Sequence, residues 1–194
     1  MKAIEINHIT KKFGSRTIIR DFSLDIHQGE FVAIVGKSGC GKSTLLNMIG
    51  LLETIETGEV KIYNQAIPKI NSATATKLRR HTINYLFQSY ALISDMTVKD
   101  NLLLALEYVK INTLSGGEQQ RVAVARTILK PGDIILADEP TGALDPKLAD
   151  IAFEFIRELR DTDNKTIVLV THNIEQAKQA DRLIDLNELN EKVS

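Results

Sequence analysis

Short apolar runs alternate with amphipathic stretches along the whole chain, and this alternation predicts an α/β fold. Strands are predicted where β-branched and other apolar residues cluster, at residues 3–6, 22–26, 31–35, 60–63, 83–87, 134–137 and 166–170. Helices are predicted at residues 42–52, 75–80, 98–109, 118–129, 148–160 and 175–180. We interpret the basic stretch 75–80 as a solvated helix face and the apolar stripe of 98–109 as core packing.

Polar residues follow three of the predicted strands directly. Gln88 follows the strand at 83–87, Asp138 and Glu139 follow 134–137, and His172 comes soon after 166–170. In open α/β sheets, ligands bind at the carboxyl ends of the strands. A glycine-rich segment follows a fourth strand, 31–35, so four strand ends should converge on one site.

Residues 36–43 fit the phosphate-loop pattern G-x-x-x-x-G-K-[ST] at every fixed position. Glycines let the backbone turn its N–H groups toward phosphate oxygens, and the N-terminus of the following helix adds partial positive charge. We expect Lys42 to reach the β- and γ-phosphates and Ser43 to hold Mg²⁺. An ordinary glycine-rich turn is the alternative, but the order strand, loop and helix argues against it.

A second glycine-rich turn, Leu114–Arg121, opens another predicted helix. One chain rarely needs two phosphate-binding turns for one nucleotide. We therefore expect two copies of the chain to close around ATP.

The strand-end residues suggest catalytic roles at this site. Asp138 suits the Mg²⁺ shell, through water, and Glu139 suits polarisation of an attacking water. The alternative interpretation of Asp138 and Glu139 is that both are solvated acids at the start of a loop. His172 taken alone would cap the next helix and Gln88 taken alone would be a surface residue. Beside the other groups we expect His172 to contact the γ-phosphate and Gln88 to meet metal or water.

Composition narrows the function classes. A chain of 194 residues can form one domain with a substantial core, and 24 basic against 25 acidic residues argue against a broad nucleic-acid surface. No apolar stretch reaches membrane-spanning length, and the start shows no signal-peptide pattern. Cys40 is the only cysteine, so no internal disulfide forms, which suits a reducing cytoplasm. We interpret Cys40 as a small filler residue in the loop rather than a redox group.

Over essentially its whole length, the chain resembles the nucleotide-binding subunit of ATP-binding-cassette (ABC) transporters. The resemblance implies one domain over residues 1–194, with a P-loop NTPase core sheet, flanking helices and an N-terminal antiparallel β part. A small helical subdomain at about 89–130 would carry the signature motif. Expected cofactors are ATP and Mg²⁺, and expected partners are a second copy of the chain and an integral membrane permease, not nucleic acid.

The resemblance also assigns roles to individual residues. Phe13, which the pattern alone would place in the core, matches the aromatic that stacks on adenine. The Walker A loop corresponds to Gly36, Lys37, Ser38, Gly39, Cys40, Gly41, Lys42, Ser43 and Thr44. The signature that contacts the partner's ATP corresponds to Ser115, Gly116, Gly117 and Glu118. The remaining matches are Gln88 in the Q-loop, Asp138 and Glu139 as Walker B aspartate and catalytic glutamate, Asp145 in the D-loop, and His172 as the switch histidine.

Residues 138–145 and the short C-terminus resemble one branch of the family, whose ATPases release lipoproteins or export macrolides, peptides and bacteriocins. The expected function is thus ATP hydrolysis driving export, on the cytoplasmic face of the membrane beside the permease. One alternative is an ATPase that regulates a membrane partner without transport. Another is a soluble ABC ATPase acting on ribosomes or DNA, which would normally need a second cassette or long insertions.

The spacing between two motifs departs from the family pattern. Gln88 and Ser115 lie 27 positions apart, about half the usual separation. The missing stretch would fall near residues 110–113, within the helical subdomain. It is either deleted or left out of the chain, and we favour omission because the signature is otherwise intact.

Overall fold

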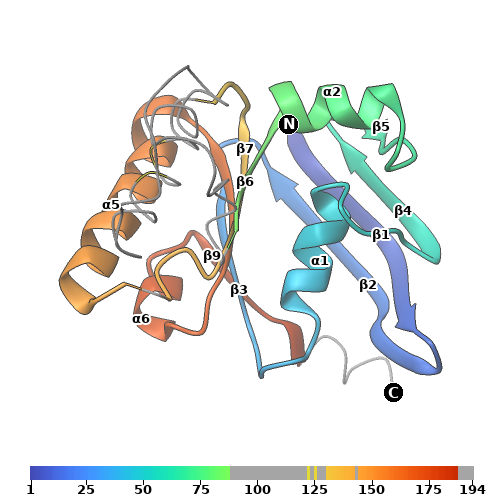
Figure 1. Cartoon of the computed structure of the whole chain (residues 1–194), viewed down its shortest axis with the longest axis horizontal. Coiled ribbons are helices and arrows are strands. Elements are labelled where there is room, and N and C mark those ends of the chain that lie inside the picture. Colours follow the sequence, from blue (N-terminus) through green and yellow to red (C-terminus); the bar gives the residue numbers. More distant parts are fainter. Residues whose placement is uncertain (88–121, 123–124, 126–129, 143, 188–194) are drawn as a thin grey trace, which may run out of the picture.

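Two sheets of different kinds form the framework of the molecule (Figure 1). A computed structural model covers the chain and describes residues 1–87, 122, 125, 130–142 and 144–187. The antiparallel sheet has the order β2-β1-β4-β5, and the parallel sheet has the order β6-β7-β8-β3-β9. This division agrees with the predicted α/β fold with an N-terminal antiparallel part.

The antiparallel sheet begins with a long hairpin. Its strands are β1 (Lys2–Phe13), β2 (Arg16–His27), β4 (Thr57–Ile62) and β5 (Gln65–Ala66). Strands β1 and β2 are each longer than predicted, because register shifts let the pairing continue past the ends of the apolar runs to Phe13 and Arg16. The tip of this hairpin consequently carries Phe13 to the edge of the sheet.

The parallel sheet carries the strand ends expected to form the site. Its strands are β3 (Phe31–Val35), β6 (Ile83–Leu86), β7 (Ile134–Asp138), β8 (Thr166–Val170) and β9 (Arg182–Asp185). Every residue of β3, β7 and β8 is buried, as expected for a parallel sheet covered on both faces. Strands β5 and β9 were not predicted, since one is very short and the other mixes charged with apolar residues.

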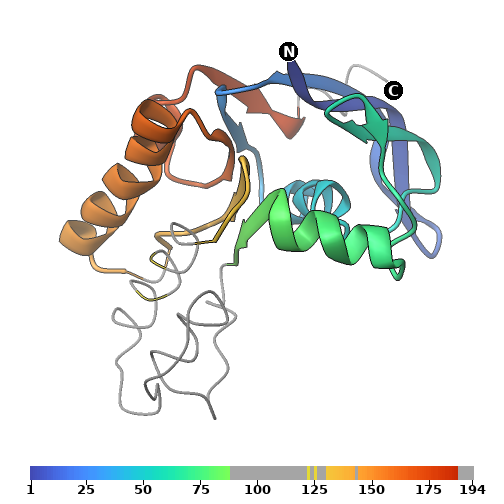
Figure 2. The same cartoon turned by 90° about the horizontal axis from the view of Figure 1, so that it is seen from above.

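Helices cover the two faces of the parallel sheet. They are α1 (Lys42–Ile49), α2 (Ala73–His81), α5 (Pro146–Asp163) and α6 (Ile174–Ala177). Helix α1 lies between the two sheets, and α5 lies against the opposite face (Figures 1 and 2). One core cluster joins α1 to both sheets, and a second joins α5 to the parallel sheet. The layers therefore enclose the strand ends from both sides.

Helix boundaries follow local chemistry. Helix α1 ends at Ile49, before the predicted 52, because Gly50 caps it and Leu51 takes a positive φ of 59°. Helix α5 begins at Pro146, whose ring suits the first turn. The predicted helices 98–109 and, for the most part, 118–129 lie outside the described residues. Within the described part, no helix is long and apolar enough to cross a membrane.

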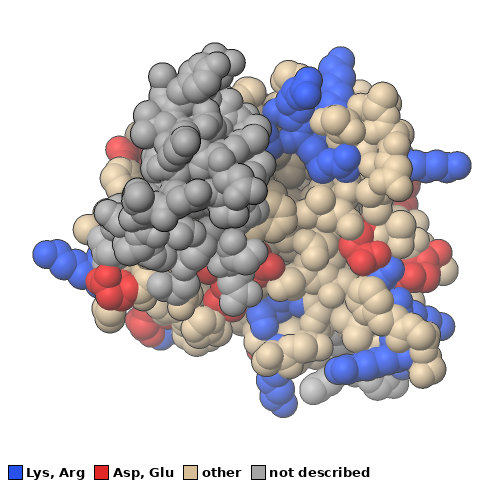
Figure 3. All heavy atoms as spheres, viewed as in Figure 1, with Lys and Arg blue, Asp and Glu red and all other residues tan. Residues whose placement is uncertain are grey.

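Helix α2 carries the basic residues that the sequence indicated. Its last turn holds Arg79, Arg80 and His81, and basic side chains gather over it at the top of the molecule (Figure 3). Arg79 departs from the predicted solvated face: it is half-buried and donates to the carbonyls of Leu51 and Ile70 at 2.9 and 3.1 Å. Arg79 therefore binds α2 to the loop after α1, while other basic residues of the helix stay exposed.

Candidate functional site

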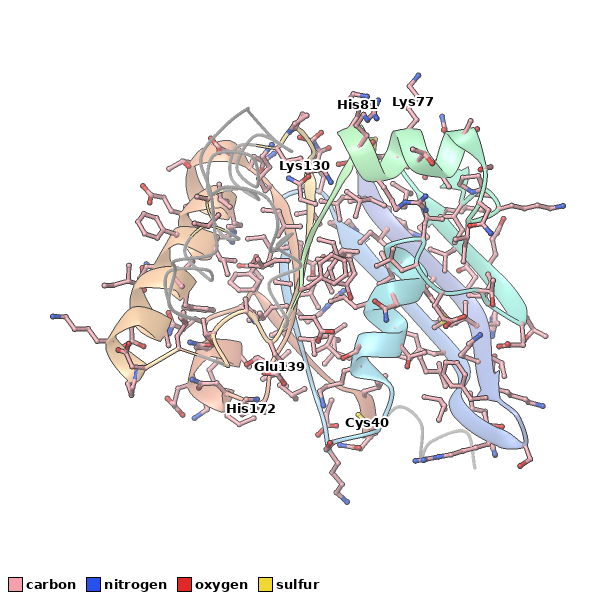
Figure 4. All side chains as sticks on the ribbon, in the orientation of Figure 1. Cys40, Lys77, His81, Lys130, Glu139 and His172 are labelled. Atoms are coloured by element: carbon pink, nitrogen blue, oxygen red, sulfur yellow. The ribbon has the colours of Figure 1, made fainter. Side chains whose placement is uncertain are left out.

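The carboxyl ends of β3, β7 and β8 meet at one edge of the parallel sheet. Residue Val170 of β8 is paired with Ile34 on one side and with Asp138 on the other. These three strands therefore end at the same level. In Figure 4 the labelled Glu139 and His172 lie together at this edge, and Cys40 lies near them at the start of α1.

The phosphate-loop segment needs its glycines. Gly41 has a φ of 106°, and a Cβ at this position would lie 2.8 Å from Cγ2 of Ile18. Gly36, at the start of the loop, has a φ of 147°. A Cβ at this position would lie 2.8 Å from Sγ of Cys40. Because Gly41 is also the N-cap of α1 and has no side chain, the first turn of that helix is left open to a ligand.

Lys42 is folded over this loop. Its Nζ donates to the backbone carbonyls of Gly36 at 2.8 Å and Lys37 at 3.1 Å. These bonds hold the ammonium inside the turn rather than in solvent. A phosphate bound in the turn would meet a cation already in position.

Ser43 and Asp138, the two residues expected to hold Mg²⁺, are joined directly. The Ser43 hydroxyl donates to Oδ1 of Asp138 at 3.0 Å. Burial raises the pKa of Asp138, as does the charge of Glu139, while the Ser43 hydrogen bond and Lys42 act in the opposite direction. A carboxylate that is costly to bury is one that a bound cation would stabilise.

The chemistry of this pair fits Mg²⁺, which prefers hydroxyl, carboxylate and phosphate oxygens. No cluster of three or more His, Cys, Asp or Glu side chains that could hold a metal occurs in the described part of the chain. A cation here would therefore depend on Ser43, Asp138 and oxygens of the bound ligand.

Glu139 and His172 form the second contact of the site. Oε2 of Glu139 lies 2.6 Å from Nδ1 of His172 and accepts from the His172 backbone N–H at 3.3 Å. Glu139 takes a positive φ of 47°, which an N–H bond to the carbonyl of Val170 at 2.9 Å helps to hold. The glutamate side chain is 13% exposed and the histidine 72%. The two residues predicted to act on water and phosphate are thus adjacent.

A cavity of about 290 Å³ lies beside Lys42, Ser43 of the first contact and Glu139 of the second. It is lined by Phe13, Ile18, Ser38, Gly39, Gly41, Lys42, Ser43, Thr44 and Glu139. Phe13 is 50% exposed there, so placing it in the core on pattern alone is wrong. Ile18 was missed because its place in a long strand gives no sign that it faces the loop.

Other predicted residues lie away from this cavity or outside the described residues. Asp145 is exposed just before α5, and its carbonyl accepts from the Ala149 N–H at 2.9 Å. Lys37 is exposed, and its backbone N–H donates to Oδ1 of Asn187 at 3.4 Å. The predicted roles that fall outside the described residues are those of Gln88, Ser115, Gly116, Gly117 and Glu118.

Comparison with known proteins identifies the family of the chain. The family described as ABC transporter matches residues 19–110 and 102–142. The macrolide export ATP-binding/permease protein MacB of Campylobacter jejuni is 38% identical over 211 aligned residues, which cover 95% of this chain and 33% of that protein. MacB of Neisseria meningitidis is 37% identical over 218 residues, covering 97% and 34%. The chain thus spans about a third of the length of these relatives.

The short spacing before the signature falls outside the described residues, so the choice between omitted residues, which we favour, and a deletion stays a prediction. The alignment with the Campylobacter relative occupies 211 positions, more than the 194 residues of the chain, so that relative carries residues that this chain lacks. Their placement near residues 110–113 stays a prediction.

Solved structures agree with the sequence matches. The ATP-binding cassette MJ0796, in a dimeric structure of a post-hydrolysis state bound to ADP and Pi, superposes with a TM-score of 0.84 at 35% identity. The superposition covers 94% of this chain and 93% of that one. These matches confirm the expected fold, family and ATPase class. The chain therefore belongs to the ABC transporter family and is built as one of its ATP-binding cassettes.

Proposed function

We propose that this chain binds ATP with Mg²⁺ in the cavity at the ends of β3, β7 and β8, hydrolyses it between two copies of itself, and drives export through a membrane permease. The observation that carries the proposal is the convergence of two contacts on one cavity: Ser43 with Asp138, and Glu139 with His172. The first contact suits a metal-bound phosphate and the second suits an attacking water.

The residues divide the chemistry among them. Lys42 and the open first turn of α1 would bind the phosphate chain, while Ser43 and Asp138 would hold Mg²⁺, which neutralises developing charge on the phosphates when bound. Glu139 lines the cavity and would accept a proton from the attacking water. His172 would hold the Glu139 carboxylate in place and contact the γ-phosphate.

Dimerisation supplies the second half of the site in this proposal. Ser115, Gly116 and Gly117 would contact ATP held by the other copy, so that the γ-phosphate touches both chains. Closure would be favoured only while that phosphate is present, and hydrolysis would let the dimer open. The dimeric cassettes among the similar structures support this arrangement.

The membrane partner is inferred from the relatives. The MacB proteins are named as combined ATP-binding and permease proteins, and this chain matches about a third of each. We assign the permease role to a separate membrane protein docking beside residues 88–100, with the cassette on the cytoplasmic side. Regulation of a membrane protein without transport is the second candidate function, since the cassette alone does not distinguish regulation from export.

The test is the substitution Glu139→Gln in the full chain. Loss of a general base should lower turnover by about 10²–10⁴-fold while ATP binding persists, and the variant should elute as a dimer with ATP and Mg²⁺. Glu154→Gln, on the exposed side of α5, is the matched control and should hydrolyse ATP normally. A Glu139 variant that is monomeric and fully active would remove Glu139 from the reaction.

A further inference from the structure

Lys11 is a nearly buried cation in direct contact with the Phe13 ring. It is 3% exposed, although its position on β1 lies only two residues from the half-exposed Phe13. Positions two apart on a strand share a face, and Nζ of Lys11 lies 4.9 Å from the centroid of the Phe13 ring. Lysine is rarely buried to this degree unless its charge is paired.

The ammonium of Lys11 is held from three sides. It donates to Oε1 of Glu53 at 3.0 Å, to Oγ1 of Thr54 at 3.3 Å and to Oε1 of Glu56 at 3.0 Å. An ammonium has three donors, so these acceptors use all of them and define its position. Burial disfavours the charged form, but the carboxylates of Glu53 and Glu56 outweigh it and the pKa of Lys11 is raised. The cation therefore persists at neutral pH.

The three acceptors lie on the loop that follows α1, the helix whose N-terminus forms the phosphate loop. Glu56 also binds β1 through its backbone, since its N–H donates to the Thr10 carbonyl at 3.2 Å, and its Oε2 accepts from the Lys12 N–H at 3.0 Å. The cluster thus connects the end of β1 that carries Phe13 to the helix that starts at Lys42. Phe13 lines the cavity above that helix, together with Thr44.

We propose that Lys11 is a positioning residue for nucleotide-base recognition: its ammonium, held by Glu53 and Glu56, covers one face of the Phe13 ring and presents the remaining surface to the base of the bound nucleotide. The inference rests on the proposed function, with Phe13 in the role that the family resemblance implies, as the aromatic that stacks on adenine. The contact of the ammonium with one face fixes the orientation of the half-exposed ring. A ring that is already held in place loses less side-chain freedom when a base stacks on it. The phosphate chain would bind on the other side of the cavity, so its contribution to affinity would not depend on the contact between Lys11 and Phe13.

The experiment compares ATP with inorganic tripolyphosphate, which has the phosphate chain but no base, by calorimetry with Mg²⁺ on the full chain. Lys11→Met keeps the length of the side chain and removes its charge. We expect it to weaken ATP binding by about two- to tenfold and to leave tripolyphosphate binding unchanged. The matched control is Lys61→Met, which breaks an ion pair with Glu59 on β4 and should alter neither affinity.

A second set of variants separates this proposal from its premise. Phe13→Ala should weaken ATP binding alone, and Lys11→Met added to it should have no further effect, because the ring through which Lys11 acts is gone. If Phe13→Ala leaves the two ligands equally bound, Phe13 is not the base platform and both the premise and the inference fail. If Phe13→Ala behaves as expected but Lys11→Met weakens both ligands equally, or neither, Lys11 only fastens the loop and the inference alone is overturned.

One further variant covers the case in which Lys11→Met does not fold. Glu53→Gln with Glu56→Gln keeps the cation but loosens its position. This double variant should lower ATP affinity relative to tripolyphosphate affinity, by less than Lys11→Met would. An unchanged ratio of the two affinities would contradict the proposal.

Discussion

Thr141 and Gln176 form a second link between the strand ends that carry Glu139 and His172. The Thr141 hydroxyl donates to Oε1 of Gln176 at 3.0 Å. Thr141 is 8% exposed and Gln176 is 3% exposed. Nε2 of Gln176 has no hydrogen-bond partner among the described residues. The pair therefore consists of one satisfied bond and one unsatisfied buried donor.

The cost of breaking this pair depends on which partner is removed. Thr141→Val leaves the whole Gln176 carboxamide without a partner and should lower the free energy of unfolding by about 1–3 kcal/mol. Gln176→Leu leaves only the Thr141 hydroxyl without a partner, and it also removes the unsatisfied Nε2. It should therefore lower the free energy of unfolding by about 1 kcal/mol or less. Replacing both residues leaves no unpaired group and should be nearly neutral. The coupling between the two sites is then about 1–4 kcal/mol.

Urea unfolding of the nucleotide-free chain measures the three variants. Thr162→Val is the matched control, because the Thr162 side chain is exposed and its hydroxyl bonds to the Glu158 carbonyl of its own helix. We expect the control to change stability by less than about 0.5 kcal/mol. If the double variant is destabilised by the sum of the single variants, the two residues do not interact and the reasoning is refuted.

Two further predictions concern the phosphate and metal positions. Lys42→Met should weaken ATP and tripolyphosphate alike, by about 10- to 100-fold, because a charge-assisted contact to the phosphates is lost; unchanged affinities in calorimetry would exclude Lys42 from the site. Burial raises the pKa of Asp138, so the folded protein holds that proton more tightly than the unfolded chain, and ionised Asp138 lowers stability at pH values above its folded pKa. Asp138→Asn should therefore keep or raise the urea midpoint of the nucleotide-free chain at neutral pH while losing Mg²⁺-dependent ATP hydrolysis. A lower midpoint, or retained hydrolysis, would contradict this assignment.

Motifs with fixed spacing made the catalytic part of the site predictable. The glycines and lysine of the phosphate loop follow the buried strand β3, and the two acids lie at the end of the buried strand β7. The rule that parallel strands end at one edge then brings them together without knowledge of the fold. The 3.0 Å contact of Ser43 with Asp138 and the 2.6 Å contact of Glu139 with His172 show that these residues lie together, while their roles stay predictions.

Contacts made across the two sheets could not be predicted in the same way. Ile18 faces Gly41, and Lys11 reaches Glu53 and Glu56, only because the antiparallel sheet packs over α1. Pairing of this kind depends on register shifts in β1 and β2, which no periodicity in the sequence indicates. The same shifts carry Phe13 out of the core, where its apolar character alone would have placed it.

The antiparallel sheet consequently contacts both ends of α1 as well as covering it. Replacement of Gly41 by a larger residue would press on Ile18, because the hairpin packs closely against the phosphate loop. The hairpin in turn is held to the loop after α1 by Lys11, whose ammonium touches the Phe13 ring. The base side and the phosphate side of the proposed nucleotide site are therefore connected through α1, at its first turn and beyond its last. Comparison of ATP with a base-free polyphosphate distinguishes the two ends, because loss of Lys11 should change only the affinity that depends on the base.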